Sequence, residues 1–265
     1  MWQQHPDIPF PADETAAIWR FMSVAGLVDL LDSAALAFSR LDSLDDPFEG
    51  QATAMDYVKS VLPEQVFRAA GGAPPEIRNK LDQWRVQQAH EMEQKQAIAL
   101  LKRMPLAETC WVSCWHQVEE ERAGLWRLYH PAGKPVAVCS TVGALRDALR
   151  DDAGHTVSIG QVQYAEGAQA AWSPIAQAMV KHRAFGEERE IRAIIAPAAG
   201  SANGLGPVVR VPVTLGTLVQ AVRFSPVAEP WQVELGRRLL ARFGLVADCG
   251  QSALHAHPAF MPSVA

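Results

Sequence analysis

The stretch that decides the fold is Lys181-His-Arg-Ala-Phe-Gly-Glu-Glu-Arg-Glu-Ile-Arg-Ala-Ile-Ile-Ala196. Its first half is polar and charged, and its second half is an apolar run that Pro197 closes. This pattern predicts a strand that enters a core from a charged rim. Because alternate side chains of a strand share one face, we expect Glu188, Glu190 and Arg192 to lie together on it.

Two interpretations of this acidic pair stay open. Two neighbouring carboxylates repel each other, and a nearby guanidinium reduces that cost. In the first interpretation the stretch is a solvated strand end with an ion pair. In the second it is a catalytic acidic pair at the mouth of a cleft. The residues that the rest of the chain brings to this face decide between them.

The composition is that of an ordinary globular protein. A chain of 265 residues with 49% hydrophobic and 20% charged residues can bury a full core. A net charge of -5 gives no overall attraction to nucleic acid or to anionic membranes. No apolar stretch approaches the roughly 20 residues that span a bilayer, and the N-terminus lacks a signal-peptide pattern. The four scattered cysteines indicate no disulfide framework, so we expect a cytoplasmic protein.

The apolar run 16–22 predicts a strand that is interrupted only by Arg20. That arginine either extends to the edge of the strand or projects into a cleft as an anion-binding fork. Ser23 is the predicted N-cap of a helix over 24–32, and a second strand is predicted over 34–39.

The acidic segment 42–49 precedes a long helical segment. Asp46 fits the N-cap, Pro47 the first helical position and Glu49 the third. The alternative is that these acids bind a divalent metal through oxygen ligands. The chain then reads as helical to residue 104, and Pro105 ends the segment.

Downstream, strands and helices alternate. Strands are predicted over 109–116, 134–139, 157–164, 208–213 and 219–224, and helices over 124–129, 175–182 and 230–243. A further helix is predicted to run to about residue 150, with Ser140 or Thr141 as its N-cap. The glycine-rich segment 198–206 is expected to be a hairpin loop.

The strand over 109–116 is expected to place Cys110, Cys114 and His116 on one face. Zinc needs closely convergent ligands, so we interpret these cysteines as structural. In the helix that follows, Trp126 and Tyr129 are three positions apart and lie on one side. They form either part of the core or a stacking wall for a ligand.

Several motifs resemble an uncharacterised bacterial family, the domain of unknown function family 2971. The resemblance covers roughly residues 17–254. The matching motifs are Trp19-Arg20-Phe21, Asp45-Asp46-Pro47-Phe48-Glu49 (Asp for the family's Asn), Cys114-Trp115-His116, Trp126-Arg-Leu-Tyr129, and Lys181 and Phe185 followed by Glu188-Arg-Glu190-Ile-Arg192.

The order of the motifs is also similar to ADP-ribosyltransferases. That resemblance implies that Arg20 grips NAD, that Trp126 and Tyr129 flank nicotinamide, and that Glu190 stabilises positive charge on the ribose. A fixed carboxylate suits an oxocarbenium-like centre, and a bidentate cation suits a pyrophosphate. His116 departs from the serine or threonine found in many transferases, although histidine can still donate to a ribose hydroxyl.

We therefore expect a single α+β domain over 1–265, built on a mixed or split antiparallel sheet with flanking helices and similar to ADP-ribosyltransferases. Segments 14–46 and 105–254 form the expected sheet core, 47–104 a helical insertion and 255–265 a tail.

The expected function is that of an NAD-using ADP-ribosyltransferase or NAD glycohydrolase, as in a toxin or defence factor, that modifies a protein or nucleic-acid acceptor and needs no membrane. The expected catalytic residues are Glu190, Glu188 and His116, and the expected cofactor-binding residues are Arg20, Trp126, Tyr129, Lys181 and Arg192. Two alternatives remain: a non-catalytic module that binds a ligand or partner, and a metal-dependent hydrolase using Asp45, Asp46, Glu49 and Glu188.

Overall fold

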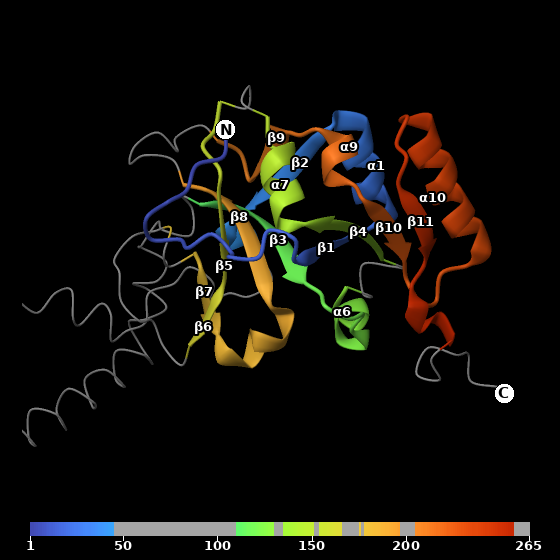
Figure 1. The fold of residues 1–265 in the computed structure, drawn as a ribbon, viewed down its shortest axis with the longest axis horizontal. Helices are drawn as coiled ribbons and strands as arrows, with labels where there is room; N and C mark the ends of the chain where they lie inside the picture. The colour runs from blue at the N-terminus through green and yellow to red at the C-terminus, as the bar shows by residue number, and fades with distance from the viewer. Residues whose placement is uncertain are drawn as a thin grey trace, which may run out of the picture.

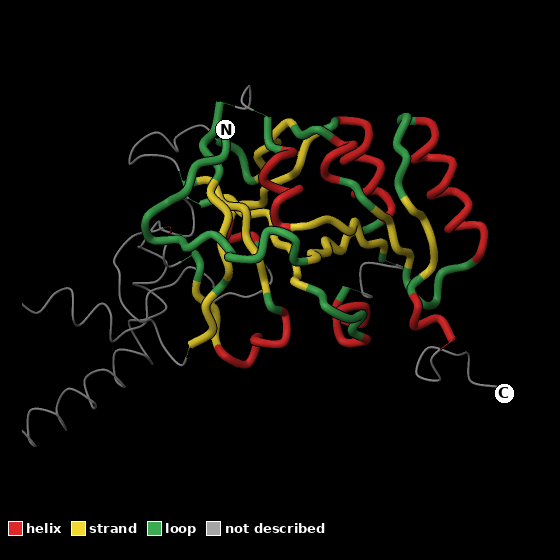
Figure 2. Tube along the Cα trace, in the orientation of Figure 1, coloured by secondary structure: helices red, strands yellow, loops and turns green. Residues whose placement is uncertain are grey.

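The computed structural model describes residues 1–44, 110–129, 135–150, 154–165, 175, 178–196 and 205–256. The predicted motif at 45–49 and the predicted helical insertion at 47–104 lie outside these residues. The described part is an α+β structure with a large mixed, mostly antiparallel open sheet (Figures 1 and 2).

Within this part, the sheet follows the order β11-β10-β4-β1-β3-β2-β9, and β8 and β5 extend it from β3. Only the β10–β11 pair in it is parallel. The strands are β1 (Ala17–Met22), β2 (Ala35–Arg40), β3 (Trp111–Gln117), β4 (Val136–Thr141), β5 (Ser158–Gln161), β8 (Glu190–Ile195), β9 (Val208–Pro212), β10 (Ala221–Phe224) and β11 (Asp248–Gln251). A separate parallel pair joins β6 (Gln163–Ala165) and β7 (Val180–His182).

Strand β3 is the junction of the sheet. Along one edge it pairs with β8 from Trp111 to His116. On its other edge, β2 pairs with its beginning and β1 with its end. Strands β1 and β2 therefore separate from each other along the middle of β3, and the sheet is split at that point. The sheet is therefore mixed and mostly antiparallel, as expected.

Most helices cover one face of the sheet. The main apolar cluster joins side chains of α1 (Val24–Ser33), α7 (Val142–Ala148), α9 (Leu215–Leu218) and α10 (Pro230–Arg242) to the sheet. Helix α6 (Ala123–Leu128) belongs to a smaller cluster and lies on the other side of the sheet (Figure 1). Three short 3-10 helices complete the described elements: η1 (Leu41–Ser43), η5 (Arg183–Glu188) and η6 (Ala253–Ala256).

Two predicted helix starts are confirmed by their capping bonds. The Ser23 hydroxyl accepts a hydrogen bond from the Gly26 amide at 3.0 Å, and the Thr141 hydroxyl accepts one from the Ala144 amide at 3.1 Å. Each bond satisfies one amide that the first helical turn leaves without an internal partner.

Two local predictions are wrong, and one strand was missed. The end of the helix expected over 175–182 forms strand β7 instead, because backbone pairing with β6 outweighs the helical pattern there. The segment 198–206 joins no hairpin, since β9 pairs with β2 and not with β8. Strand β11 was not predicted; it follows α10 and lies parallel beside β10.

Candidate functional site

The centre of the candidate site is an ion pair on β8. The Glu190 carboxylate accepts hydrogen bonds from Nε of Arg192 at 2.6 Å and from its terminal nitrogen at 3.0 Å. The guanidinium also donates to the Ala178 carbonyl at 2.5 Å. Glu190 and Arg192 are both buried, and both were expected on one face of a strand. That expectation is confirmed.

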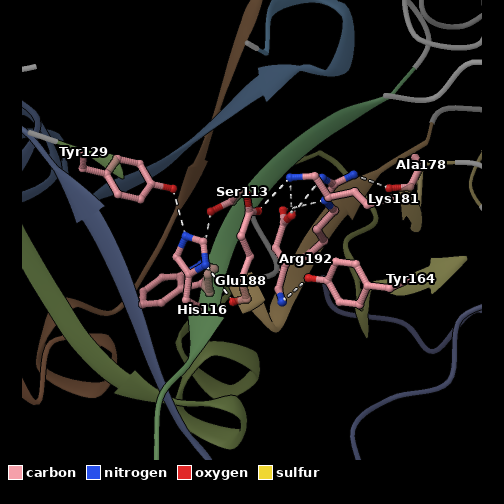
Figure 3. A network of polar contacts seen from close by, with 10 residues as sticks. Ser113, His116, Tyr129, Tyr164, Ala178, Lys181, Glu188 and Arg192 are labelled. Carbon is pink, nitrogen blue, oxygen red and sulfur yellow. Dashed lines mark hydrogen bonds and ion pairs between the residues drawn. The ribbon is translucent and has the colours of Figure 1, made fainter. Parts of the chain in front are cut away.

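Lys181 joins a second carboxylate to this pair. Its ammonium lies 2.8 Å from Glu188 and 3.2 Å from Glu190 (Figure 3). We had expected Glu188 to lie on the same strand as Glu190. This is wrong, because Glu188 is the last residue of η5. The next residue, Arg189, has a left-handed backbone with φ of 42°, and β8 begins only after it. The two acids meet through Lys181 and not through strand alternation.

Burial and pairing act in opposite directions on Glu190. Burial alone would raise the pKa of the Glu190 carboxyl. The charge and hydrogen bonds of Arg192, with help from Lys181 and the Cys114 thiol, outweigh burial and lower that pKa to about 2. Glu190 is therefore an ionised carboxylate that is already fully surrounded by cations and donors.

His116 lies on the same face as Glu190, because the two residues are directly paired across β3 and β8. Its Nδ1 is 2.9 Å from the Glu188 carbonyl, which can only accept a hydrogen bond. Nδ1 is therefore the protonated nitrogen, and Nε2 accepts from the Tyr129 hydroxyl at 2.8 Å (Figure 3). Burial lowers the pKa of His116, which keeps the ring neutral.

Of the two interpretations left open for Trp126, part of the core or a wall for nicotinamide, its burial supports the core. It is 2% exposed and packs edge-on against Phe21 and Trp19, so it is a core residue. Tyr129 is half-buried, stacks on Phe21 with 7° between the ring planes, and points its hydroxyl at His116. Burial raises the pKa of Tyr129.

Arg20 leaves the sheet from the opposite face. Its neighbour Trp19 pairs with His116, so strand alternation points Arg20 away from the face of Glu190. Of these three expected site residues, His116 and Glu190 therefore share a face, and Arg20 does not. Its guanidinium instead lies at the split, where it donates to the Ser113 hydroxyl at 2.5 Å and to the Ala37 carbonyl at 2.8 Å.

Two residues of this network were not predicted. Tyr164 accepts a hydrogen bond from the Glu190 amide at 2.8 Å, and Ser113 is the partner of Arg20. A signal for Ser113 was present, since it is a polar residue between Trp111 and Trp115 on one face of its strand. No comparable signal marked Tyr164, because β6 and β8 are brought together only by the tertiary fold.

The structure offers no support for a metal centre in its described residues, where no group of three or more metal-ligating side chains occurs. The four cysteines are free thiols. The acids Asp45, Asp46 and Glu49 of the predicted metal hydrolase lie outside the described residues. No helix in the described part is long and apolar enough to cross a membrane.

Comparison of the chain with protein-family models, with curated proteins and with solved structures gave no match. The family resemblance therefore rests on the motifs alone.

Proposed function

We propose that this protein binds NAD at the split of the sheet and catalyses ADP-ribosyl transfer or NAD hydrolysis. The observation that carries the proposal is the environment of Arg20. Burial lowers the pKa of Arg20, and no carboxylate among the described residues lies in ion-pair range of it. A desolvated cation of this kind is stabilised by an anionic ligand, and its planar fork suits a phosphate.

NAD is the ligand class that matches both charged parts of the site. It carries a negative pyrophosphate and, at the other end, a positively charged nicotinamide riboside. Arg20 offers the cation for the first part. The acidic cluster around Glu188 offers negative charge for the second part. Arg20 contacts Ser113 of β3, and Glu190 is paired with His116 of the same strand. Strand β3 therefore lies between the cation at the split and the acids at β8.

The reaction breaks the bond between the nicotinamide nitrogen and C1′ of the ribose. The electron pair of that bond stays with nicotinamide, which leaves as a neutral molecule, and positive charge develops on the ribose. A nearby carboxylate stabilises this charge. An oxygen of water, or a nucleophile of an acceptor, then bonds to C1′ and releases a proton. The products are nicotinamide and ADP-ribose, free or attached.

The test is incubation of the full chain with NAD, with chromatographic detection of nicotinamide and calorimetric measurement of NAD binding. Arg20→Gln should weaken NAD binding by roughly 10- to 100-fold, the range for a hydrogen bond to a charged group. Arg210→Gln is the matched control, since Arg210 is an exposed arginine paired with Asp29. A wild-type chain that neither binds NAD nor releases nicotinamide contradicts the proposal.

A second candidate is a non-catalytic module that binds a nucleotide or partner. The observation that favours it is the enclosure of Glu190, which is 1% exposed and occupied on both oxygens. The same experiment separates the two candidates. NAD binding without nicotinamide release supports the binding module, and release supports the enzyme.

A further inference from the structure

We infer that Glu188, and not Glu190, is the carboxylate that meets the positive charge of the substrate, and that Glu190 is a positioning residue. This inference rests on the function proposed above. It reverses the roles expected from the sequence, where Glu190 was the catalytic acid and Glu188 its support.

Glu190 has no oxygen left for a substrate. One carboxylate oxygen binds Nε of Arg192, and the other binds both Arg192 and Lys181. Its side chain is only 2% exposed. A positively charged ribose that approached this carboxylate would meet the two cations around it first. The geometry assigns Glu190 the task of holding Arg192 and Lys181 in place.

Glu188 differs in both respects. Only one of its carboxylate oxygens has a partner among the described residues, namely the Lys181 ammonium. Its side chain is 15% exposed, against 8% for Lys181. The charges of Glu190, Arg192 and Lys181 sum to one positive charge, so Glu188 is the group that brings the cluster to neutrality. The open oxygen of Glu188 is therefore where the cluster presents negative charge to a ligand.

The backbone around Glu188 is fixed from two sides. The imidazole of His116 donates to the Glu188 carbonyl, and the guanidinium of Arg122 donates to the Glu187 carbonyl at 2.7 Å. These bonds anchor the end of η5 to β3 and to the residue before α6. A carboxylate held in this way loses little freedom when charge develops beside it, which is the requirement for electrostatic catalysis. His116 acts here through Glu188, so it is a positioning residue.

In the proposed step, the electron pair of the glycosidic bond leaves with nicotinamide, and the open oxygen of Glu188 stabilises the positive C1′. Glu188 forms no covalent bond and is unchanged at the end. The proton released when water or an acceptor adds to C1′ passes to solvent.

The experiment compares Glu188→Gln, Glu190→Gln and the control Glu120→Gln, since Glu120 is an exposed acid between β3 and α6. We expect Glu188→Gln to lower kcat by at least about 100-fold, the effect of losing one electrostatic stabiliser, with KM near wild type and a smaller loss of Tm than in Glu190→Gln. Glu190→Gln should lower Tm strongly and keep more turnover per folded molecule than Glu188→Gln. A stable Glu190→Gln protein without turnover, or an active Glu188→Gln protein, overturns the inference.

A second measurement does not depend on turnover. A water-soluble carbodiimide with an amine couples to accessible carboxylates, and mass spectrometry locates the products. We expect Glu188 to be modified and Glu190 to be protected in the native protein. If the wild type releases no nicotinamide, the proposed function fails. The labelling result still shows which of the two carboxylates is accessible to a ligand. Equal modification of the two acids overturns the inference.

Discussion

Glu190 and Arg192, two residues apart on β8, form a two-bond ion pair whose carboxylate is 2% exposed and whose guanidinium is fully buried. Neither group has access to water that would replace the other. The pair therefore behaves as one unit in folding, whatever ligand the protein binds.

Removal of either partner should be strongly destabilising. Arg192→Met or Glu190→Gln leaves a buried charge without its partner, and we expect each to lower the free energy of unfolding by about 3–5 kcal/mol. The double variant should recover part of this loss. Urea unfolding measures all three.

The exposed pair of Arg210 and Asp29 supplies the control. Its side chains are 51% and 45% exposed, so Arg210→Met should change stability by less than about 1 kcal/mol. Equal losses for Arg210→Met and Arg192→Met would contradict the role of burial in this prediction.

The decrease in the free energy of unfolding at acid pH should depend on the Glu190 carboxylate. Its pKa of about 2 lies below 4.5, the ordinary value for a glutamate, so the ionised form stabilises the fold. This contribution is fully present above pH 4.5 and is lost as the pH falls from about 4.5 to about 2, by roughly 3 kcal/mol. Urea titrations from pH 7 to pH 2.5 measure it. The Glu190→Gln variant should lack this part of the pH dependence, and an unchanged profile in that variant would refute the assignment.

His116 should remain neutral with its proton on Nδ1. Burial lowers the pKa of this ring below 6.5, so its contribution to stability is present above pH 6.5 and is lost as the pH falls below that value. Nitrogen-15 correlation spectra distinguish the two tautomers and follow protonation. His116→Asn should keep the bond to the Glu188 carbonyl better than His116→Gln, because the asparagine amide occupies the position of Nδ1. The reverse order of stabilities would show that Nε2 is the nitrogen that matters.

Gly160 should not tolerate a side chain. A methyl group there would collide with Ile8 and lie 3.1 Å from Met179, and Ile8 is buried. We expect Gly160→Ala to cost about 1–3 kcal/mol, as overpacking does. The double variant Gly160→Ala with Ile8→Ala should be less damaging than the sum of the single variants. Strict additivity in thermal melts would argue against this contact.

The elements that local patterns encode were predictable from the sequence. The strand over 109–116 alternates as expected, with Cys114 and His116 on one face and Ser113 and Trp115 on the other. Ser23 and Thr141 cap their helices because the capping bond involves residues only three positions apart. The charged face of β8 was likewise visible in the spacing of Glu190 and Arg192.

The candidate site was predicted less well, since its geometry depends on contacts between distant residues. Arg20 is on the other face of the sheet because Trp19, and not Arg20, is paired with His116. This register between β1 and β3 is set by the pairing of distant segments. The left-handed Arg189, which moves Glu188 off the strand, has no glycine to mark it. The burial of Trp126 follows from packing against Phe21 and Trp19.

The junction at β3 has a consequence for the order in which the chain assembles. Arg20 and Ser113 are 93 residues apart in sequence, and His116 and Glu188 are 72 apart, yet both contacts involve this strand. Contacts between residues so far apart in sequence form slowly compared with local helices. During synthesis β1 and β2 emerge well before β3, and β3 well before β8. Until β3 and β8 are in place, the unpaired edges of the earlier strands can pair with strands of other molecules. The refolding yield should therefore fall steeply as the protein concentration rises.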